Sequence, residues 1–315
     1  MEIDYPNSFE KSILDNYSRN QNSSIQNFKR FTYLHPKLNE KKFDLLRMYK
    51  MLKHYGVKNY FTKSEGIVDF IIAGWPRTGT TSLHNHLVQH QNLEGPWTGV
   101  LHFFSYGYNR GINYYHSNFR FNKNKKILTF ESSDGDILHP SSMRRINQYN
   151  PEMKIIICLR NPIDQVYSRY NHKITIGEEI QSLEDAISSD DDRKKLHLAR
   201  LENNIYSHVV HPIILPYLYM AQYSTHLKNA FKEIPKERFF IVDSNELKNN
   251  TQKTADDVFE FLGLEKKEIS GIGEFLHSHE YKEKMLSETR QKLKEYFTPF
   301  NEELEKMLSR KFNWE

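Results

Sequence analysis

The segment that most constrains this chain runs from position 68 to position 87 and reads VDFIIAGWPRTGTTSLHNHL. An apolar run with β-branched residues, Val68–Ala73, comes first and predicts a strand. A polar loop with two glycines follows, and the residues from Ser82 to His90 predict a helix. Such a unit holds anions, because the loop amides and the positive end of the helix dipole point at the ligand. We therefore predict an anion site here, with a strand–helix turn that binds nothing as the alternative.

The loop differs from the P-loop that binds nucleoside triphosphates. Gly74 and Gly79 have the spacing of the pattern G-x-x-x-x-G-K-[ST], but Thr80 stands where that pattern has lysine. The cation of this loop is Arg77 instead. A triphosphate site needs its lysine on the outer phosphates and a hydroxyl on magnesium, and Thr81 meets only the second need. The loop alone therefore leaves the identity of the anion open.

The composition indicates a folded chain with an anionic ligand. The chain has 315 residues, 38% of them hydrophobic, which is enough for one large α/β domain with appendages or for two domains. The net charge of +4 suits an anionic substrate. It falls short of the dense Lys/Arg pattern of nucleic-acid binders, so we expect no nucleic-acid partner.

The N-terminal residues, the length of the apolar runs and the cysteine content bear on localisation. The N-terminal residues are polar, without the apolar segment of a secretory signal. No apolar run reaches the roughly 18–20 residues that a membrane span needs. The only cysteine, Cys158, lies in an apolar run, which favours a buried structural thiol over a reactive one. These features predict a cytoplasmic protein without a membrane span.

Predicted strands and helices alternate along the rest of the chain. Strands are expected at Ile127–Glu131, Lys154–Leu159 and Arg238–Asp243. Helices are expected at Pro140–Asn150, Pro162–Tyr170, Pro216–Phe231, Thr254–Leu262 and Ser287–Arg310, the last with a potential break at Pro299. The alternation predicts a three-layer α/β/α fold with a central, mainly parallel sheet and a P-loop-like strand-loop-helix site. Ligands of such sheets bind beyond the carboxyl ends of the strands.

The remaining segments are expected to be less regular. Residues 1–65 predict an N-terminal arm and an amphipathic helix, Glu40–Tyr55, packed on a main domain of residues 66–315. Ser105–Asn118 has no periodicity and predicts a loop. The helix that begins at Ser182 is expected to be interrupted by the charged segment Asp190–Lys195. Its three aspartates fit a solvated turn better than a metal site, so we predict no metal.

A second pair of polar residues follows the strand Lys154–Leu159. Arg160 leaves the strand tip, and Ser168 lies about two helical turns further on. A guanidinium and a hydroxyl that converge there are suited to a phosphate group. From spacing alone, a structural ion pair of Arg160 is the alternative.

Together, the two motifs resemble the sulfotransferase family that uses 3′-phosphoadenosine-5′-phosphosulfate (PAPS). Trp75–Ser82 (WPRTGTTS) resembles the 5′-phosphosulfate loop of that family, and Arg160–Tyr170 (RNPIDQVYSRY) resembles its 3′-phosphate motif. His102-Phe103-Phe104 and Glu131-Ser132-Ser133 resemble segments of the carbohydrate and heparan sulfate branch. The resemblance covers about residues 66–312.

The resemblance implies a donor, a product and a set of site residues. The donor is PAPS, the product is 3′,5′-adenosine bisphosphate (PAP), and no metal is needed. The residues implied in donor binding are Arg77, Thr78, Gly79, Thr80, Thr81, Ser82, Arg160 and Ser168. The residues implied in catalysis are Arg77, His102 and Glu131.

The general base stays open at this point. His102 is the first candidate, since its ordinary pKa is near 6.5, and a packed core histidine is its alternative. Glu131 is the second candidate and Glu94 the third. The sequence departs from the branch in three places: Arg77 replaces a common lysine, Val100 a catalytic glutamate, and Ser132 a lysine.

The sequence thus predicts an enzyme that transfers a sulfuryl group by in-line displacement. The acceptor is a hydroxyl, or failing that an amine, of a glycan or a small hydroxylated metabolite. A P-loop nucleotide or metabolite kinase is one alternative, and a catalytically silent nucleotide- or glycan-binding module is another. The exact acceptor and the oligomeric state do not follow from the sequence.

Overall fold

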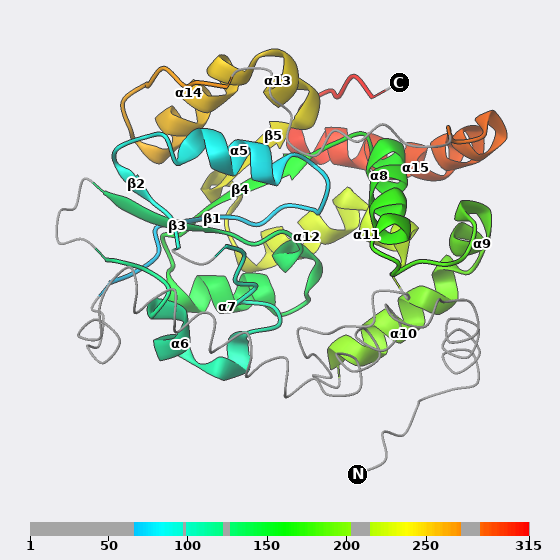
Figure 1. The fold of residues 1–315 in the computed structure, drawn as a ribbon, viewed down its shortest axis with the longest axis horizontal. Coiled ribbons are helices and arrows are strands. Elements are labelled where there is room, and N and C mark those ends of the chain that lie inside the picture. The colour runs from blue at the N-terminus through cyan, green and yellow to red at the C-terminus, as the bar shows by residue number, and fades with distance from the viewer. Residues whose placement is uncertain (1–65, 97–98, 122–126, 203–214, 272–283, 315) are drawn as a thin grey trace, which may run out of the picture.

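A computed structural model describes residues 66–96, 99–121, 127–202, 215–271 and 284–314 (Figure 1). The predicted arm and the helix Glu40–Tyr55 lie outside the described residues.

The sheet has five parallel strands in the order β2-β3-β1-β4-β5. The strands are β1 Phe70–Ile72, β2 Leu93–Glu94, β3 Leu128–Ser132, β4 Lys154–Leu159 and β5 Phe239–Asp243. β4 lies between β1 and β5, and five of its six residues are fully buried, as its apolar sequence predicted. The parallel α/β fold predicted from the sequence is therefore confirmed.

Helices cover both faces of this sheet (Figure 1). On one face lie α5 Thr80–Leu87, α13 Ser244–Asn249 and α14 Thr251–Leu262, packed on a core that includes Phe70 and Ile72. On the other face lie α7 Ser142–Tyr149 and α12 Tyr223–Glu233, packed on a core that includes Ile71. Successive residues of β1 thus point to opposite layers, as the pleat requires. The short helix α6 Ile112–His116 lies on the side of α7.

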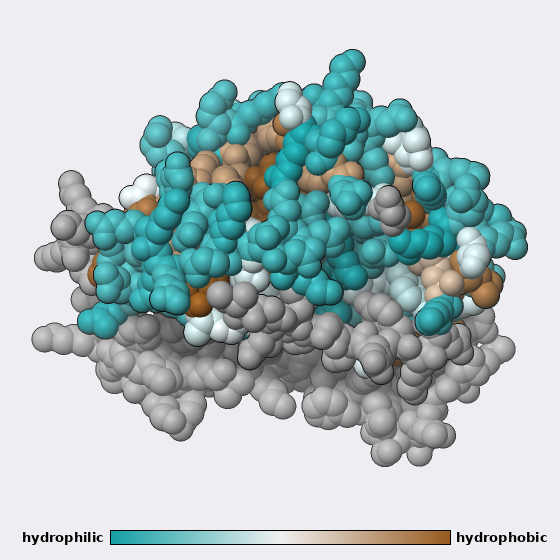
Figure 2. Space-filling model, turned by 90° about the horizontal axis from the view of Figure 1, so that it is seen from above, coloured by the Kyte–Doolittle hydropathy of each residue, from teal (hydrophilic) through white to brown (hydrophobic). Residues whose placement is uncertain are grey.

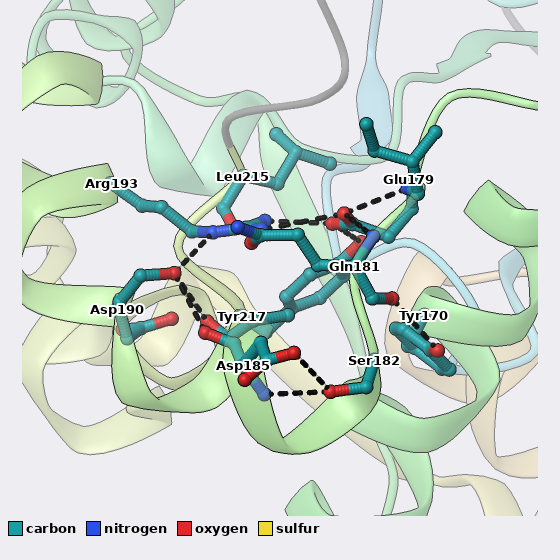
Figure 3. Close-up of polar contacts among 12 residues, drawn as sticks. Tyr170, Glu179, Gln181, Ser182, Asp185, Asp190, Arg193, Leu215 and Tyr217 are labelled. Carbon is teal, nitrogen blue, oxygen red and sulfur yellow. Dashed lines mark hydrogen bonds and ion pairs between the residues drawn. The ribbon is translucent and has the colours of Figure 1, made fainter. Parts of the chain in front are cut away.

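A group of helices stands beyond one end of the sheet (Figure 1). It comprises α8 Pro162–Thr175, α9 Leu183–Ser188, α10 Asp190–Glu202, α11 Tyr217–Met220 and α15 Ser287–Leu308. A buried polar network joins α10, α11 and the segment after α8 (Figure 3). Arg193 Nη1 donates to Glu179 Oε2 at 2.7 Å, and the Tyr217 hydroxyl donates to the same oxygen at 3.0 Å. Arg193 and Glu179 have side chains without exposed surface, so the ion pair holds these elements together inside the protein.

Three local predictions are wrong. Asp190–Lys195 is the first part of α10, because aspartates suit the first turn of a helix. Asp190 is buried, and its carboxylate accepts from the amides of Leu218 and Tyr219 at 2.9 and 3.0 Å. The expected loop Ser105–Asn118 contains the 3-10 turn η1 Tyr108–Arg110 and α6.

The third error concerns Pro216–Phe231, which forms two helices, α11 and α12, instead of one. The C-terminal helix α15 continues through Pro299 without a break.

Candidate functional site

The loop between β1 and α5 has a shape that its glycines make possible. A Cβ atom on Gly74 would lie 2.9 Å from the backbone nitrogen of Cys158 in β4, so only glycine fits there. Gly79 caps α5 with φ +96°, and Arg77 adopts φ +70°, both in the left-handed region. The left-handed conformation of a non-glycine residue such as Arg77 costs free energy, and such strain concentrates at functional sites.

Three hydrogen bonds hold the loop between β1 and α5 in place. The Thr78 hydroxyl donates to the Trp75 carbonyl at 2.7 Å, and Gln165 Nε2 of α8 donates to the Pro76 carbonyl at 3.0 Å. The Trp75 indole donates to the Met220 carbonyl at 2.6 Å. Thr78 and Trp75 have no exposed surface. The loop is therefore held in position by the protein itself.

The predicted hydroxyl residues of the loop differ in exposure. Thr81, in the first turn of α5, is exposed, whereas Thr80 and Ser82 are buried. The Thr78 hydroxyl is already engaged within the loop. Thr81 is thus the predicted hydroxyl that faces solvent.

The structure brings the two predicted phosphate motifs into direct contact. Arg77 Nε donates to Ser168 Oγ at 3.1 Å, and Arg160 Nη1 donates to the Arg77 carbonyl at 3.3 Å. Asn161 explains the geometry of the second motif, because its side chain accepts from the Ile163 amide at 2.9 Å and starts α8. Arg160 therefore leaves the carboxyl end of β4 beside the loop that follows β1.

His102 lies at a strained turn close to an acid. Its φ is +49°, its amide donates to Ser133 Oγ at 3.0 Å, and its ring Nε2 is 3.8 Å from Asp134 Oδ1. The side chain keeps 27% of its surface exposed, whereas its ring Nδ1 atom is buried without a hydrogen-bond partner. Burial lowers the pKa of His102, Asp134 opposes this, and Arg169 lowers the pKa further. The ring is therefore neutral at pH 7 and able to accept a proton.

Glu131 is enclosed beneath this turn. It lies in β3 opposite Ile71 of β1 and has no exposed surface. Burial raises the pKa of its carboxyl to about 7, and the nearby hydroxyls of Ser133 and Tyr115 oppose this shift. Asp136 is buried as well, and burial followed by the charge of Glu131 raises its pKa well above the ordinary range. Two buried acids with raised pKa values thus lie at the carboxyl end of β3.

Glu131→Gln is expected to change the pH dependence of stability. Because the folded protein holds the proton of Glu131 more tightly than the unfolded chain, ionisation destabilises the fold as the pH rises from about 4.5 to about 7. The amide does not ionise, so the variant should lose part of that decline. Melting temperatures of both proteins between pH 4 and pH 8 measure this. If the melting temperatures of the two proteins changed with pH in parallel, the prediction that Glu131 ionises while buried would be wrong.

The third candidate base is remote from the other two. Glu94 ends the edge strand β2, which is separated from β1 by β3. Burial raises its pKa and the charge of Arg120 lowers it. In the described part of the chain, its contacts do not reach His102 or Arg77.

The sequence reasoning missed Gln165, Arg169 and Asp134. Gln165 lies three residues before Ser168 on α8, so helical periodicity was a usable signal for Gln165. Arg169 directly follows Ser168 and therefore points to another side of the helix, so periodicity gave no signal for it. Asp134 follows the Glu131 segment in a loop, where spacing gives no direction to a side chain.

The described residues contain no group of three or more histidine, cysteine or acidic side chains suited to a metal ion. Among them, no helix is both long enough and apolar enough to cross a bilayer. Figure 2 shows a mostly hydrophilic surface on the side of α13 and α14.

Comparisons with known proteins point to one family. The family model described as "Sulfotransferase domain" matches residues 68–312. The human bifunctional heparan sulfate N-deacetylase/N-sulfotransferase 2 is 28% identical over 205 residues, which is 62% of this chain and 22% of that protein. The Caenorhabditis elegans bifunctional heparan sulfate N-deacetylase/N-sulfotransferase 1 is 25% identical over 211 residues, 64% of this chain and 22% of that protein. The chain thus spans about a fifth of the length of these relatives.

A solved structure supports the fold. The sulfotransferase from Alicyclobacillus acidocaldarius superposes with a TM-score of 0.64 at 22% identity. The match covers 78% of this chain and 98% of that one.

Proposed function

Because this chain belongs to the sulfotransferase domain family, we propose that it transfers a sulfuryl group from PAPS to an acceptor. The acceptor is a hydroxyl, or failing that an amine, of a glycan or a small hydroxylated metabolite. The contact of Arg77 with Ser168 and Arg160 is the observation that carries the proposal. It joins two anion-binding motifs at the carboxyl edge of a parallel sheet, where such folds bind nucleotides.

The residues at this edge fit a donor with two separated anionic groups. The loop amides, the N-terminus of α5, Arg77 and the exposed Thr81 hydroxyl suit the phosphosulfate end. Arg160 and Ser168 suit the 3′-phosphate. Arg160 donates to a backbone carbonyl rather than to a carboxylate, so its charge is not neutralised by that contact. When bound, PAPS supplies the activated sulfuryl group.

We assign His102 as the general base that removes the proton of the acceptor. Its ring is partly exposed, and burial keeps it neutral, whereas the Glu131 carboxyl has no exposed surface. Glu131 acts as a positioning residue in this scheme, since the Ser133 hydroxyl beside it accepts the amide of His102. Arg77 and the loop amides stabilise the negative charge that develops on the leaving phosphate.

Donor binding is the first test. PAP is expected to raise the melting temperature of the wild-type protein, because a ligand of the folded state at 100 times its Kd adds about 2.7 kcal/mol. ATP with magnesium should give no comparable rise. Arg160→Ala should abolish most of the PAP effect, whereas Arg144→Ala, at an exposed position of α7, should keep it.

The outcomes separate the alternatives. Stabilisation by ATP with magnesium but not by PAP would replace the proposal with a kinase. PAP binding without transfer of label from radioactive PAPS to any acceptor in a panel of glycans and phenols would indicate a silent binding module.

A further inference from the structure

The backbone of His102 is held on both sides of its strained conformation. Its amide donates to Ser133 Oγ at 3.0 Å, and its carbonyl accepts the amides of Tyr106 at 3.0 Å and Gly107 at 2.9 Å. The Ser105 hydroxyl lies 3.2 Å from the same carbonyl oxygen. A non-glycine residue keeps a left-handed conformation, here with φ +49°, only where its surroundings enforce it. These contacts therefore restrain the position of the candidate base.

Asp136 reaches this turn through Ser105. Ser105 Oγ is 2.5 Å from Asp136 Oδ1, and both residues are buried, Asp136 without any exposed surface. The second carboxyl oxygen of Asp136, Oδ2, is buried and has no hydrogen-bond partner. Burial of a carboxyl oxygen without a partner costs free energy, so its presence calls for an explanation. The site described above makes no use of this carboxyl.

The number of hydrogens at Ser105 indicates how the contact is made. A hydroxyl carries one hydrogen, so Ser105 cannot donate to the His102 carbonyl and to Asp136 at once. Both contacts become hydrogen bonds when the Asp136 carboxyl is protonated and donates to Ser105 Oγ. Burial, and after it the charge of Glu131, raises the pKa of the Asp136 carboxyl, which favours that state. The carboxyl, the hydroxyl and the carbonyl then form one chain of hydrogen bonds.

The segment that carries Asp136 also contacts the donor loop. The Gly135 amide donates at 2.7 Å to the carbonyl of Gly74, the first glycine of the loop between β1 and α5. The neighbouring Ser133 accepts the amide of His102, and Asp136 reaches the His102 carbonyl through one intervening hydroxyl. The residues from 133 to 136 thus join the turn of the candidate base to the loop that is suited to the donor.

We propose that Asp136 is a positioning residue for sulfuryl transfer, which holds His102 through Ser105 in the conformation that directs its ring at the acceptor. This inference rests on the proposed function and adds to it a residue that touches neither donor nor acceptor. Its effect arises from geometry, because a misplacement of about 1 Å can lower a rate by about 100-fold. Loss of Asp136 should therefore lower kcat and leave donor binding unchanged.

The first measurement is kcat per PAP-binding site, with radioactive PAPS and the fastest acceptor from the panel of glycans and phenols. Asp136→Ala should lower kcat by about 10- to 100-fold and keep the wild-type Kd for PAP, measured by calorimetry. Asp136→Asn should stay close to the wild-type kcat, because its amide group donates to Ser105 as the protonated carboxyl does. Ser142→Ala is the matched control and should keep kcat. It removes a buried hydroxyl that donates to the Phe104 carbonyl in the same turn, where Arg145 still donates.

A double-mutant cycle separates positioning of His102 from a general structural role. If Asp136 acts through His102, Asp136→Ala should lower kcat in the wild-type background and change it little in the His102→Ala background. If Asp136→Ala does not fold, Ser105→Ala takes its place in the cycle, since it breaks the same chain of hydrogen bonds.

The other outcomes would each overturn the inference. Equal fold losses of kcat in both backgrounds would assign Asp136 a structural role, and a weaker Kd for PAP would assign it to the donor site. Wild-type kcat in Asp136→Ala, or Asp136→Asn as slow as Asp136→Ala, would show that the hydrogen bond to Ser105 does not position the base. In all these cases the wild-type protein still transfers sulfate, and the proposed function stands. Absence of transfer by the wild-type protein to every acceptor would instead refute the proposed function, and the inference with it.

Discussion

Arg77→Ala is expected to lower kcat/KM for sulfuryl transfer by about 10²- to 10³-fold, the usual effect of removing one donor that stabilises developing negative charge. Arg77 donates to Ser168 and holds a left-handed conformation in the loop that follows β1. Because alanine has the same preference against positive φ, the change removes the guanidinium without a new backbone conflict. Initial rates with radioactive PAPS measure the effect.

Arg77→Lys is the matched control. Lysine keeps the positive charge, so this variant should retain activity within about tenfold of the wild type. The activity that is lost reflects the second N–H donor of the guanidinium, which lysine lacks. Both variants should melt close to the wild-type temperature. Equal activity of Arg77→Ala and the wild type would exclude Arg77 from the reaction.

Arg193→Met is expected to destabilise the fold by about 3–5 kcal/mol, because it leaves the Glu179 carboxylate buried without its cation. The loss corresponds to a melting temperature lower by roughly 6–20 °C for a domain of this size. Thermal unfolding followed by circular dichroism measures it. The network in Figure 3 is the physical reason, since Tyr217 and Gln181 also depend on this pair.

Two further variants test the origin of that loss. Lys195→Ala removes a cation from an exposed pair with Asp192, and it should cost less than about 1 kcal/mol. The double variant Arg193→Met, Glu179→Gln should recover part of the stability, because no unpaired charge remains inside. A double variant less stable than either single variant would show that the charges themselves are not the cause.

The sequence predicted the elements of the fold whose hydrophobic pattern is set by burial of their side chains. Lys154–Leu159 was predicted as a central strand because apolar β-branched residues fill it, and β4 has the same limits. One mispredicted segment depends on a distant partner. Asp190–Lys195 forms a helix whose buried first aspartate accepts amides of α11, and no local signal reveals that partner.

The candidate site was partly predictable for the same reason. Arg77 and Arg160 belong to strand–loop–helix junctions, where the chain direction is set by the sheet, so their meeting follows from the topology. The environment of His102 depends on a strained turn and on Asp134 from another loop. The burial of Glu131 depends on how β3 pairs with β1. Such features arise from the packing of separate segments, which periodicity does not encode.

Under the proposed function, the contact between Arg77 and the second motif has a consequence for how nucleotides are distinguished. Since the Arg160 side chain rests on the Arg77 carbonyl, the spacing of the two anion sites is built into the protein before any ligand arrives. In the proposed donor site, this contact would set the distance between the two anionic groups that a nucleotide can place there. In that site, a molecule that carries only one of the two anionic groups would contact only one of the two motifs.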